Sequence, residues 1–292
     1  MNRWRWIAAG LLLAALVLGT ASDKLTAPPP ILAGGYRALT ADFHVHPFPQ
    51  SWSPLAPWDL VLQARRDQLD AIAVEGHNHL WVGQAARWFS TLTGGPTVIP
   101  AEEIHPPRGH ILALGIAHTI DWRLGSERAV DEIHRQGGVA IAAHPFASSW
   151  DMWSPAAMRK LDGVEVVHPS AYGDAKTARE FRDFYARAGA AAIGDSDFHG
   201  LGPIGLCRTW VFAQDNSASG ILDAIRAKRT VTWDGHGYIG NPELARVIDD
   251  GRLEARRTLV LPGAEVKLSR ACALLGLLIG LFAGSKRPPE RG

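Results

Sequence analysis

Short apolar segments alternate with longer segments of helical spacing through most of the chain. The apolar segments lie at 41–46, 69–76, 97–105, 109–116, 138–145, 162–168, 190–197 and 208–214. Apolar side chains recur at helical spacing in 58–68, 126–138, 175–189 and 218–229. Regular alternation of strand and helix predicts an α/β fold with a parallel sheet and helical crossovers.

The composition is that of a globular protein and resembles that of many enzymes. The chain has 292 residues, of which 47% are hydrophobic and 20% charged, and a formal net charge of +1. A chain with this many apolar residues is not expected to be disordered. A net charge near zero does not indicate a nucleic-acid partner. The length suits a single α/β barrel.

The first 21 residues have the pattern of an export signal. Arg3 and Arg5 precede an apolar core at 7–19, and Gly19 and Ala21 stand at the spacing of a cleavage site. The core is short for a membrane span of about 20 residues. Residues 1–21 are therefore expected to be either a cleaved signal peptide or a signal anchor.

The C-terminal end carries a second apolar run, followed by Lys286, Arg287 and Arg291. We expect a short transmembrane segment at 268–285, and a buried core helix is the alternative. Basic residues at both outer ends predict that the region between them is exported. The protein would then lie on the periplasmic or extracellular face, anchored to the membrane.

Between these ends the chain divides into three parts. A Pro-rich linker is expected at 22–37, a globular body at 38–240 and a weakly patterned appendage at 241–267. Cys207 lies in the body and Cys272 in the apolar tail, so a disulfide between them would require the tail to fold back. None is expected, although export would permit one.

Histidines and acidic residues gather at the ends of the expected strands. His44 and His46 are one residue apart on a strand, so their imidazoles point to the same face. The other side chains at strand ends are His77, Glu103, His144, Asp197 and His199, and His110 opens a strand. Active sites of parallel barrels lie at the carboxyl ends of the strands. One metal-binding cluster is therefore expected there.

These motifs resemble, in the same order, those of the PHP superfamily of metal-dependent phosphoesterases, the polymerase and histidinol phosphatase group. DFHVH resembles the opening His-x-His, LDAIAVEGHNH the strand that ends in Asp-His-Asn, and IPAEEIH the Pro-Gly-x-Glu motif. GHILALG, AIAAHPF, DGVEVVHP and AIGDSDFHG complete the series. The resemblance covers most of 40–240 and implies a distorted (β/α)7-type PHP barrel, with the terminal apolar segments outside it.

The resemblance also implies two or three divalent metal ions, manganese, zinc or iron. The first ion matches His44, His46, Asp197 and Glu103, the second His110 and His144 with Glu103 as the bridge, and a third His77 and His199. Glu75 and Gly76 replace the usual Asp beside His77, and 47–55 lacks the usual Asp or His. The resemblance therefore does not fix whether a third metal ion is bound.

Several neighbouring residues have less specific expectations. Glu102 is the alternative to Glu103 as the bridge, although the spacing from Pro100 favours Glu103. Asp42 is expected to orient an imidazole or to have no function. Supporting or substrate-lining roles are expected for His79, His105 and His168, solvated or structural roles for His118, His134 and His236, and helix packing or a pocket wall for Trp52, Trp58, Trp81 and Trp88.

The reaction implied is hydrolysis of a small-molecule ester, most simply a phosphate ester, by a hydroxide that bridges the metal ions. His199 or His168 is expected to protonate the leaving oxygen. Few basic residues that could clamp a phosphate lie near the motifs: Arg108, Lys176 and Arg208. A carboxylic-ester or carbamate hydrolase is therefore the alternative, and an exported binding protein without catalysis is the second alternative.

Overall fold

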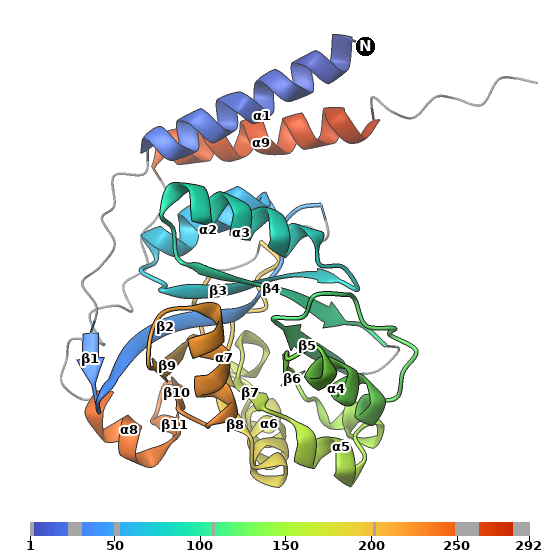
Figure 1. The fold of residues 1–292 in the computed structure, drawn as a ribbon, viewed down its shortest axis with the longest axis vertical. Helices are drawn as coiled ribbons and strands as arrows, with labels where there is room; N and C mark the ends of the chain where they lie inside the picture. The colour runs from blue at the N-terminus through green and yellow to red at the C-terminus, as the bar shows by residue number, and fades with distance from the viewer. Residues whose placement is uncertain are drawn as a thin grey trace, which may run out of the picture.

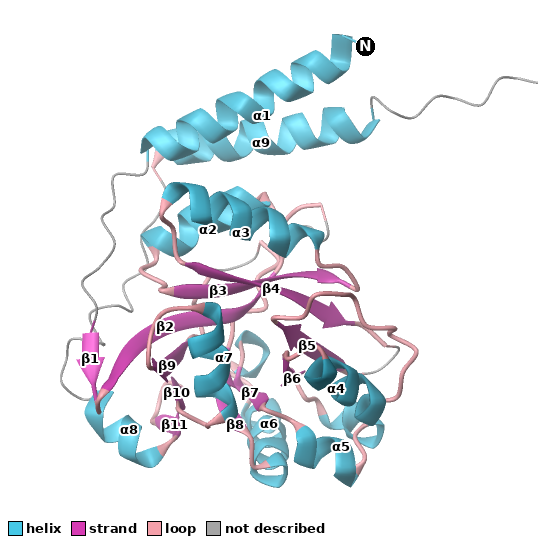
Figure 2. Ribbon diagram, in the orientation of Figure 1, coloured by secondary structure: helices cyan, strands magenta, loops and turns pink. Residues whose placement is uncertain are grey.

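The computed structural model describes residues 3–22, 31–49, 53–106, 109–200, 203–248 and 263–282. They form a mixed α/β fold around a nearly closed, barrel-like sheet (Figure 1 and Figure 2). The strands are β1 (Ile31–Ala33), β2 (Tyr36–Val45), β3 (Ala71–His77), β4 (Thr97–Ile104), β5 (His110–Leu114), β6 (Val139–Ala143), β7 (Gly163–Val167), β8 (Ala191–Gly194), β9 (Thr209–Ala213), β10 (Thr230–Trp233) and β11 (Tyr238–Gly240).

The helices are α1 (Arg3–Ser22), α2 (Pro57–Arg66), α3 (Trp81–Thr93), α4 (Ser126–Arg135), α5 (Pro155–Lys160), α6 (Ala175–Ala188), α7 (Ala218–Arg226), α8 (Pro242–Ile248) and α9 (Ala264–Phe282). Helices α2 to α6 and α8 lie on the outside of this sheet, α7 closes one end, and α1 and α9 lie beyond α2 and α3 (Figure 1). Two 3-10 helices are η1 (Ala147–Met152) and η2 (Pro169–Ala171). All eight expected strands and all four expected helices form, and the expected PHP-type barrel is confirmed.

The expected parallel sheet with helical crossovers is present only in part, and the sheet is mixed. The strand order is β11-β10-β9-β2-β3-β4-β5-β6-β7-β8, with β1 beside β2. Pairs β2–β3, β3–β4, β6–β7 and β7–β8 are parallel, but β5 is antiparallel to both neighbours and β9 is antiparallel to β2. The chain between β4 and β5 is too short for a crossover, which takes about a dozen residues, so this connection must reverse direction.

The reversal at β5 has a direct effect on the site. Ile104 pairs with Ile111 and Glu103 pairs with Leu112, so the start of β5 lies beside the end of β4. His110, the first residue of β5, therefore stands at the same end of the sheet as Glu103.

The segments after β2 and β8 meet and help to close the barrel. The His46 backbone N–H donates to the Phe198 carbonyl at 3.0 Å, and the Phe198 N–H donates to the His44 carbonyl at 3.2 Å. The Gly194 N–H donates to the Thr209 hydroxyl at 2.9 Å, which joins β8 to β9. Two segments that are far apart in the sequence thus meet at one end of the barrel and form a shared rim.

The barrel interior is apolar over most of its length. Its buried side chains come from alternate strand positions and include Leu39, Phe43, Ile99, Leu112, Ile141, Ile193 and Val211. Ile221 and Ile225 of α7 extend the same cluster. The polar residues described below therefore occupy the opposite end of the barrel.

Helices α1 and α9 lie side by side above α2 and α3 and run in opposite directions (Figure 1). None of the helices in the described ranges is long and apolar enough to cross a membrane. Lys286, Arg287 and Arg291 lie outside the described residues, as do 23–30 of the linker and 249–262 of the appendage. Both cysteines, Cys207 and Cys272, are free.

Candidate metal centre

Glu103, near the end of β4, lies at the centre of a cluster of imidazoles. Its Oε2 is 3.0 Å from His77 Nε2 and 3.3 Å from His46 Nε2. Its Oε1 is 2.6 Å from His110 Nδ1 and 3.4 Å from His144 Nε2. The two oxygens of one buried carboxylate thus face two different sets of imidazoles.

Asp197, in the loop after β8, is the second carboxylate of the cluster. Its Oδ1 is 3.2 Å from His44 Nε2, 3.5 Å from His46 Nε2 and 3.2 Å from His199 Nδ1. Its Oδ2 is 3.4 Å from His168 Nε2. The structure therefore brings together all eight residues expected as metal ligands, with His168 beside them.

An irregularity in β2 turns the two N-terminal imidazoles into the barrel. The register of β2 against β3 shifts between Asp42 and Val45. Phe43 packs in the barrel interior, whereas Val45, two residues later, packs outside the barrel with apolar residues of α2 and α3. Such bulges re-aim side chains, and here His44 and His46 face the acidic residues.

The charges of the cluster stabilise one another. Burial opposes a charge on His44, but the carboxylates of Asp197, Glu165 and Glu103 raise its pKa well above the usual range. Burial would raise the pKa of Glu103, but the charge of His44 and hydrogen bonds with His110 and His144 hold it well below its usual value. The pKa of Asp197 is lowered by the same kind of contacts. Both carboxylates are therefore ionised at neutral pH.

The donor atoms suit divalent cations. His44 Nε2, His46 Nε2 and Asp197 Oδ1 are buried without a hydrogen-bond partner among the described residues, although such atoms are normally satisfied. Three groups have ligand atoms close enough to hold an ion: His44, Glu103 and His144; His44, His46 and Asp197; and His46, His77 and His199. Imidazole nitrogen with carboxylate oxygen is a donor set for zinc, manganese or iron.

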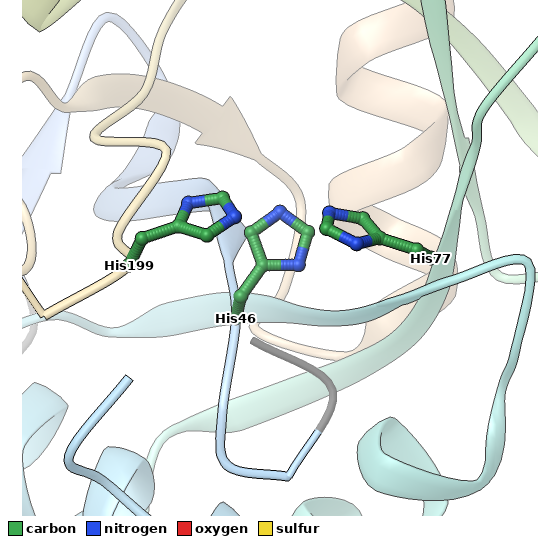
Figure 3. Close-up of side chains that lie close together, drawn as sticks. All are labelled: His46, His77 and His199. Atoms are coloured by element: carbon green, nitrogen blue, oxygen red, sulfur yellow. The ribbon is translucent and has the colours of Figure 1, made fainter. Parts of the chain in front are cut away.

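The third group is drawn in Figure 3, with His46 between His77 and His199. His46 comes from the end of β2, His77 from the end of β3 and His199 from the loop after β8. The rings of His46 and His199 are 4.3 Å apart and those of His46 and His77 are 4.7 Å apart, centre to centre. His77 and His199 are 30% and 35% exposed, so this group forms the open side of the cluster.

Glu165, which is not among the residues expected from the sequence, supports two residues of the cluster. Glu165 lies in β7 and is fully buried. Its Oε1 is 2.7 Å from His44 Nδ1, and its Oε2 accepts the backbone N–H of His144 at 2.6 Å. A charged residue in the middle of the apolar strand GVEVV was the available signal.

Among the described residues, the hydrogen bonds to the Asp42 carboxylate come from backbone N–H groups and the Ser196 hydroxyl, and none comes from an imidazole. Asp42 accepts hydrogen bonds from the Ser196 hydroxyl at 2.6 Å and from the Gly205 N–H at 2.7 Å. It therefore positions the loop that carries Asp197. Asp195 holds the end of β2 in place, since its carboxylate accepts a hydrogen bond from the Phe43 N–H at 2.6 Å.

Glu102 faces away from the cluster and accepts the Ile120 backbone N–H at 2.9 Å. Of the two glutamates, it is therefore Glu103 that faces the imidazoles. His105 borders the cluster, with its ring centre 3.8 Å from that of His110. His134 has a structural contact, 2.8 Å from Asp162.

Two of the basic residues expected near the site are engaged elsewhere. Lys176 is 86% exposed and pairs with Glu180 at 3.8 Å. Arg208 is buried and donates to the carbonyls of Gly205 and Asp67. Arg108 and Trp52 lie outside the described residues. Trp81 and Trp88 are exposed on the outer side of α3, so the expected helix packing does not apply to them. The side chains that α3 buries include Val82, Ala86 and Phe89.

The chain has recognisable relatives. Residues 178–230 match the family model described as PHP-associated. An uncharacterised protein of Methanocaldococcus jannaschii is 28% identical over 143 residues, which cover 44% of this chain and 82% of that protein.

Among solved structures, similarity is found to a two-domain protein from Bacteroides vulgatus that contains a predicted PHP-like metal-dependent phosphoesterase. The two share 23% identity with a TM-score of 0.60, over 77% of this chain and 72% of that one. The structure thus shares its fold with that protein. The ordered motifs resemble those of the PHP superfamily, and residues 178–230 match the PHP-associated family model.

Proposed function

We propose that the protein is a metal-dependent hydrolase. The observation that carries the proposal is the position of Glu103, whose Oε2 faces His46 and His77 and whose Oε1 faces His110 and His144. A carboxylate placed in this way can bridge two cations about 3.5–4 Å apart, the spacing of two-metal hydrolytic sites. His44, His46 and Asp197 would complete one side, and His110 and His144 the other.

The chain's own residues would bind the cations and move a proton. Cations held here supply Lewis acidity, which makes water more acidic and neutralises charge that develops on the substrate. His199 is the better placed proton donor, because its side chain is 35% exposed and that of His168 is 7% exposed. The hydrogen bond to Asp197 raises the pKa of His199, which favours the protonated imidazole that the leaving oxygen needs.

A phosphate ester of a small molecule is the proposed substrate, as the description of the Bacteroides vulgatus structure suggests. One observation favours a carboxylic ester or a carbamate as the second candidate. Lys176 and Arg208 are engaged in contacts away from the cluster, so neither supplies the cationic clamp typical of phosphate sites.

An assay on purified protein with added Mn²⁺ or Zn²⁺ separates the candidates. The substrates would be bis(p-nitrophenyl) phosphate, p-nitrophenyl phosphate, p-nitrophenyl acetate and an aryl carbamate. Turnover of either phosphate supports the main proposal, and turnover of the acetate or carbamate alone supports the second candidate. A metal-loaded protein that turns over none of the four would favour a binding protein without catalysis.

Two neighbouring glutamates provide a matched test of the site. Glu103→Gln should lower turnover by more than about 100-fold, the upper end of losses for residues that only orient metal ligands. It should also lower the bound metal measured by mass spectrometry. Glu102→Gln is the control, because Glu102 is equally buried but faces Ile120. Equal activity and metal content in the Glu103 variant and the wild type would contradict the assignment.

A further inference from the structure

Helices α1 and α9 form an antiparallel pair, here called the terminal hairpin (Arg3–Ser22 and Ala264–Phe282). The Ser269 hydroxyl donates to the Ala15 carbonyl at 2.7 Å. Gly276 allows close approach, since a Cβ there would lie 2.9 Å from Leu12 Cγ. Arg270 hydrogen-bonds Gln63 of α2. The hairpin therefore has a specific internal interface and a specific attachment to the body.

The outer surface of the terminal hairpin is apolar. Its large exposed side chains are Trp4, Trp6, Ile7, Leu13 and Val17 on α1, and Leu268, Leu275, Leu278, Leu281 and Phe282 on α9. The most exposed of these, Phe282, keeps 72% of its surface accessible. Soluble proteins seldom expose so much apolar surface unless it binds a partner or a membrane.

The charges of the hairpin indicate which partner. Arg3 and Arg5 flank Trp4 and Trp6 at the outer end, with the Arg3 guanidinium 5.2 Å from the Trp4 ring centre. Basic residues beside tryptophan at the edge of an apolar helix are typical of helices in the membrane interface. A second copy of the terminal hairpin would offer these arginines few carboxylates. Helix α1 has no acidic residue, and Glu265 lies in the first turn of α9.

We propose that the terminal hairpin is a lipid-docking element for membranes that contain anionic phospholipids. Its apolar face enters one leaflet, and Arg3 and Arg5 contact the headgroups. The uncharged part of α9, 271–282, would be about 18 Å long at 1.5 Å per residue, short of a hydrocarbon core of about 30 Å. Attachment of this kind holds the body at the membrane surface and does not depend on the hydrolase reaction.

Flotation of the full chain with lipid vesicles tests the proposal. The protein should rise with vesicles of phosphatidylcholine and phosphatidylglycerol, and less with phosphatidylcholine alone. Arg3→Gln with Arg5→Gln should remove this difference. Leu275→Glu and Leu281→Glu should each lower the bound fraction at least about tenfold, because each places a charge where an apolar side chain would be buried.

Leu92→Glu is the matched control, since Leu92 is 65% exposed but lies on α3. It should float like the wild type. All variants change outward-facing residues, and thermal melting by circular dichroism checks that each still folds. Absence of flotation with both kinds of vesicle would overturn the proposal. Dimers seen by light scattering without flotation, and lost in the Leu275 variant, would instead assign the surface to a second copy of the chain.

Discussion

Replacing Glu165 with glutamine should weaken metal binding without touching a metal ligand. The Glu165 carboxylate holds the His44 imidazole at 2.7 Å and the His144 backbone at 2.6 Å. It thus fixes which nitrogen of His44 is free for a cation, and it supports His144, whose φ is +25°. Glutamine has one carbonyl oxygen and one amide, so it can accept only one of these two hydrogen bonds well.

The expected magnitude follows from the bond that is lost. A hydrogen bond to a charged group contributes about 1.5–3 kcal/mol. Since about 1.4 kcal/mol corresponds to a factor of ten, metal affinity should fall by roughly 10-fold to 100-fold. Losses of the same size, about 10-fold to 100-fold, are typical when residues that orient metal ligands are replaced.

Competition between the protein and a chromogenic chelator for Zn²⁺ measures this change. Glu75→Gln is the matched control, because Glu75 is also buried beside the cluster and has no hydrogen-bond partner among the described residues. Burial raises the pKa of Glu75 well above its usual value, which favours the neutral carboxyl group, so replacement by a neutral amide should change little. Unchanged Zn²⁺ affinity in the Glu165 variant would refute the reasoning, as would an equal loss in both variants.

Two further predictions concern pH and thiol chemistry. Burial raises the pKa of Asp59 to about 6 from 3.8. The folded chain therefore holds this proton more tightly than the unfolded one, and between pH 3.8 and 6 stability should fall as pH rises. In denaturant titrations at several pH values, Asp59→Asn should reduce this pH-dependent loss of unfolding free energy by about 1–3 kcal/mol. Identical pH profiles of stability in the variant and the wild type would contradict the prediction. Burial also raises the pKa of the Cys207 thiol, so a disulfide reagent should label Cys272 first and Cys207 only after unfolding; rapid labelling of both in native protein would be inconsistent with this burial.

The sequence predicts the strands well because a strand's apolar pattern is local. It does not predict their directions, which depend on the connections between them. The short link before His110 reverses β5 and brings this imidazole to Glu103, whereas a parallel β5 would have placed it at the opposite end of the sheet. The order of motifs, not the sheet direction, was therefore the useful signal for the site.

The supporting residues could not be predicted for a different reason. Glu165 acts through contacts with residues 121 and 21 positions earlier in the chain, and no local pattern marks such pairs. The two tryptophans of α3 show the same limit, because helical spacing alone does not say which face of a helix meets the sheet. Aromatic residues at Trp81 and Trp88 lie on the solvent side.

The shared rim formed by the segments after β2 and β8 couples the site to the whole barrel. His46 and Asp197, on either side of this rim, follow β2 and β8, which are far apart in the sequence, and the segments that carry them meet at the rim. An ion bound by both residues would link the two segments, since unfolding of either segment would release it. Binding free energy would then add to folding free energy, by about 2.7 kcal/mol when the free ion exceeds its dissociation constant 100-fold.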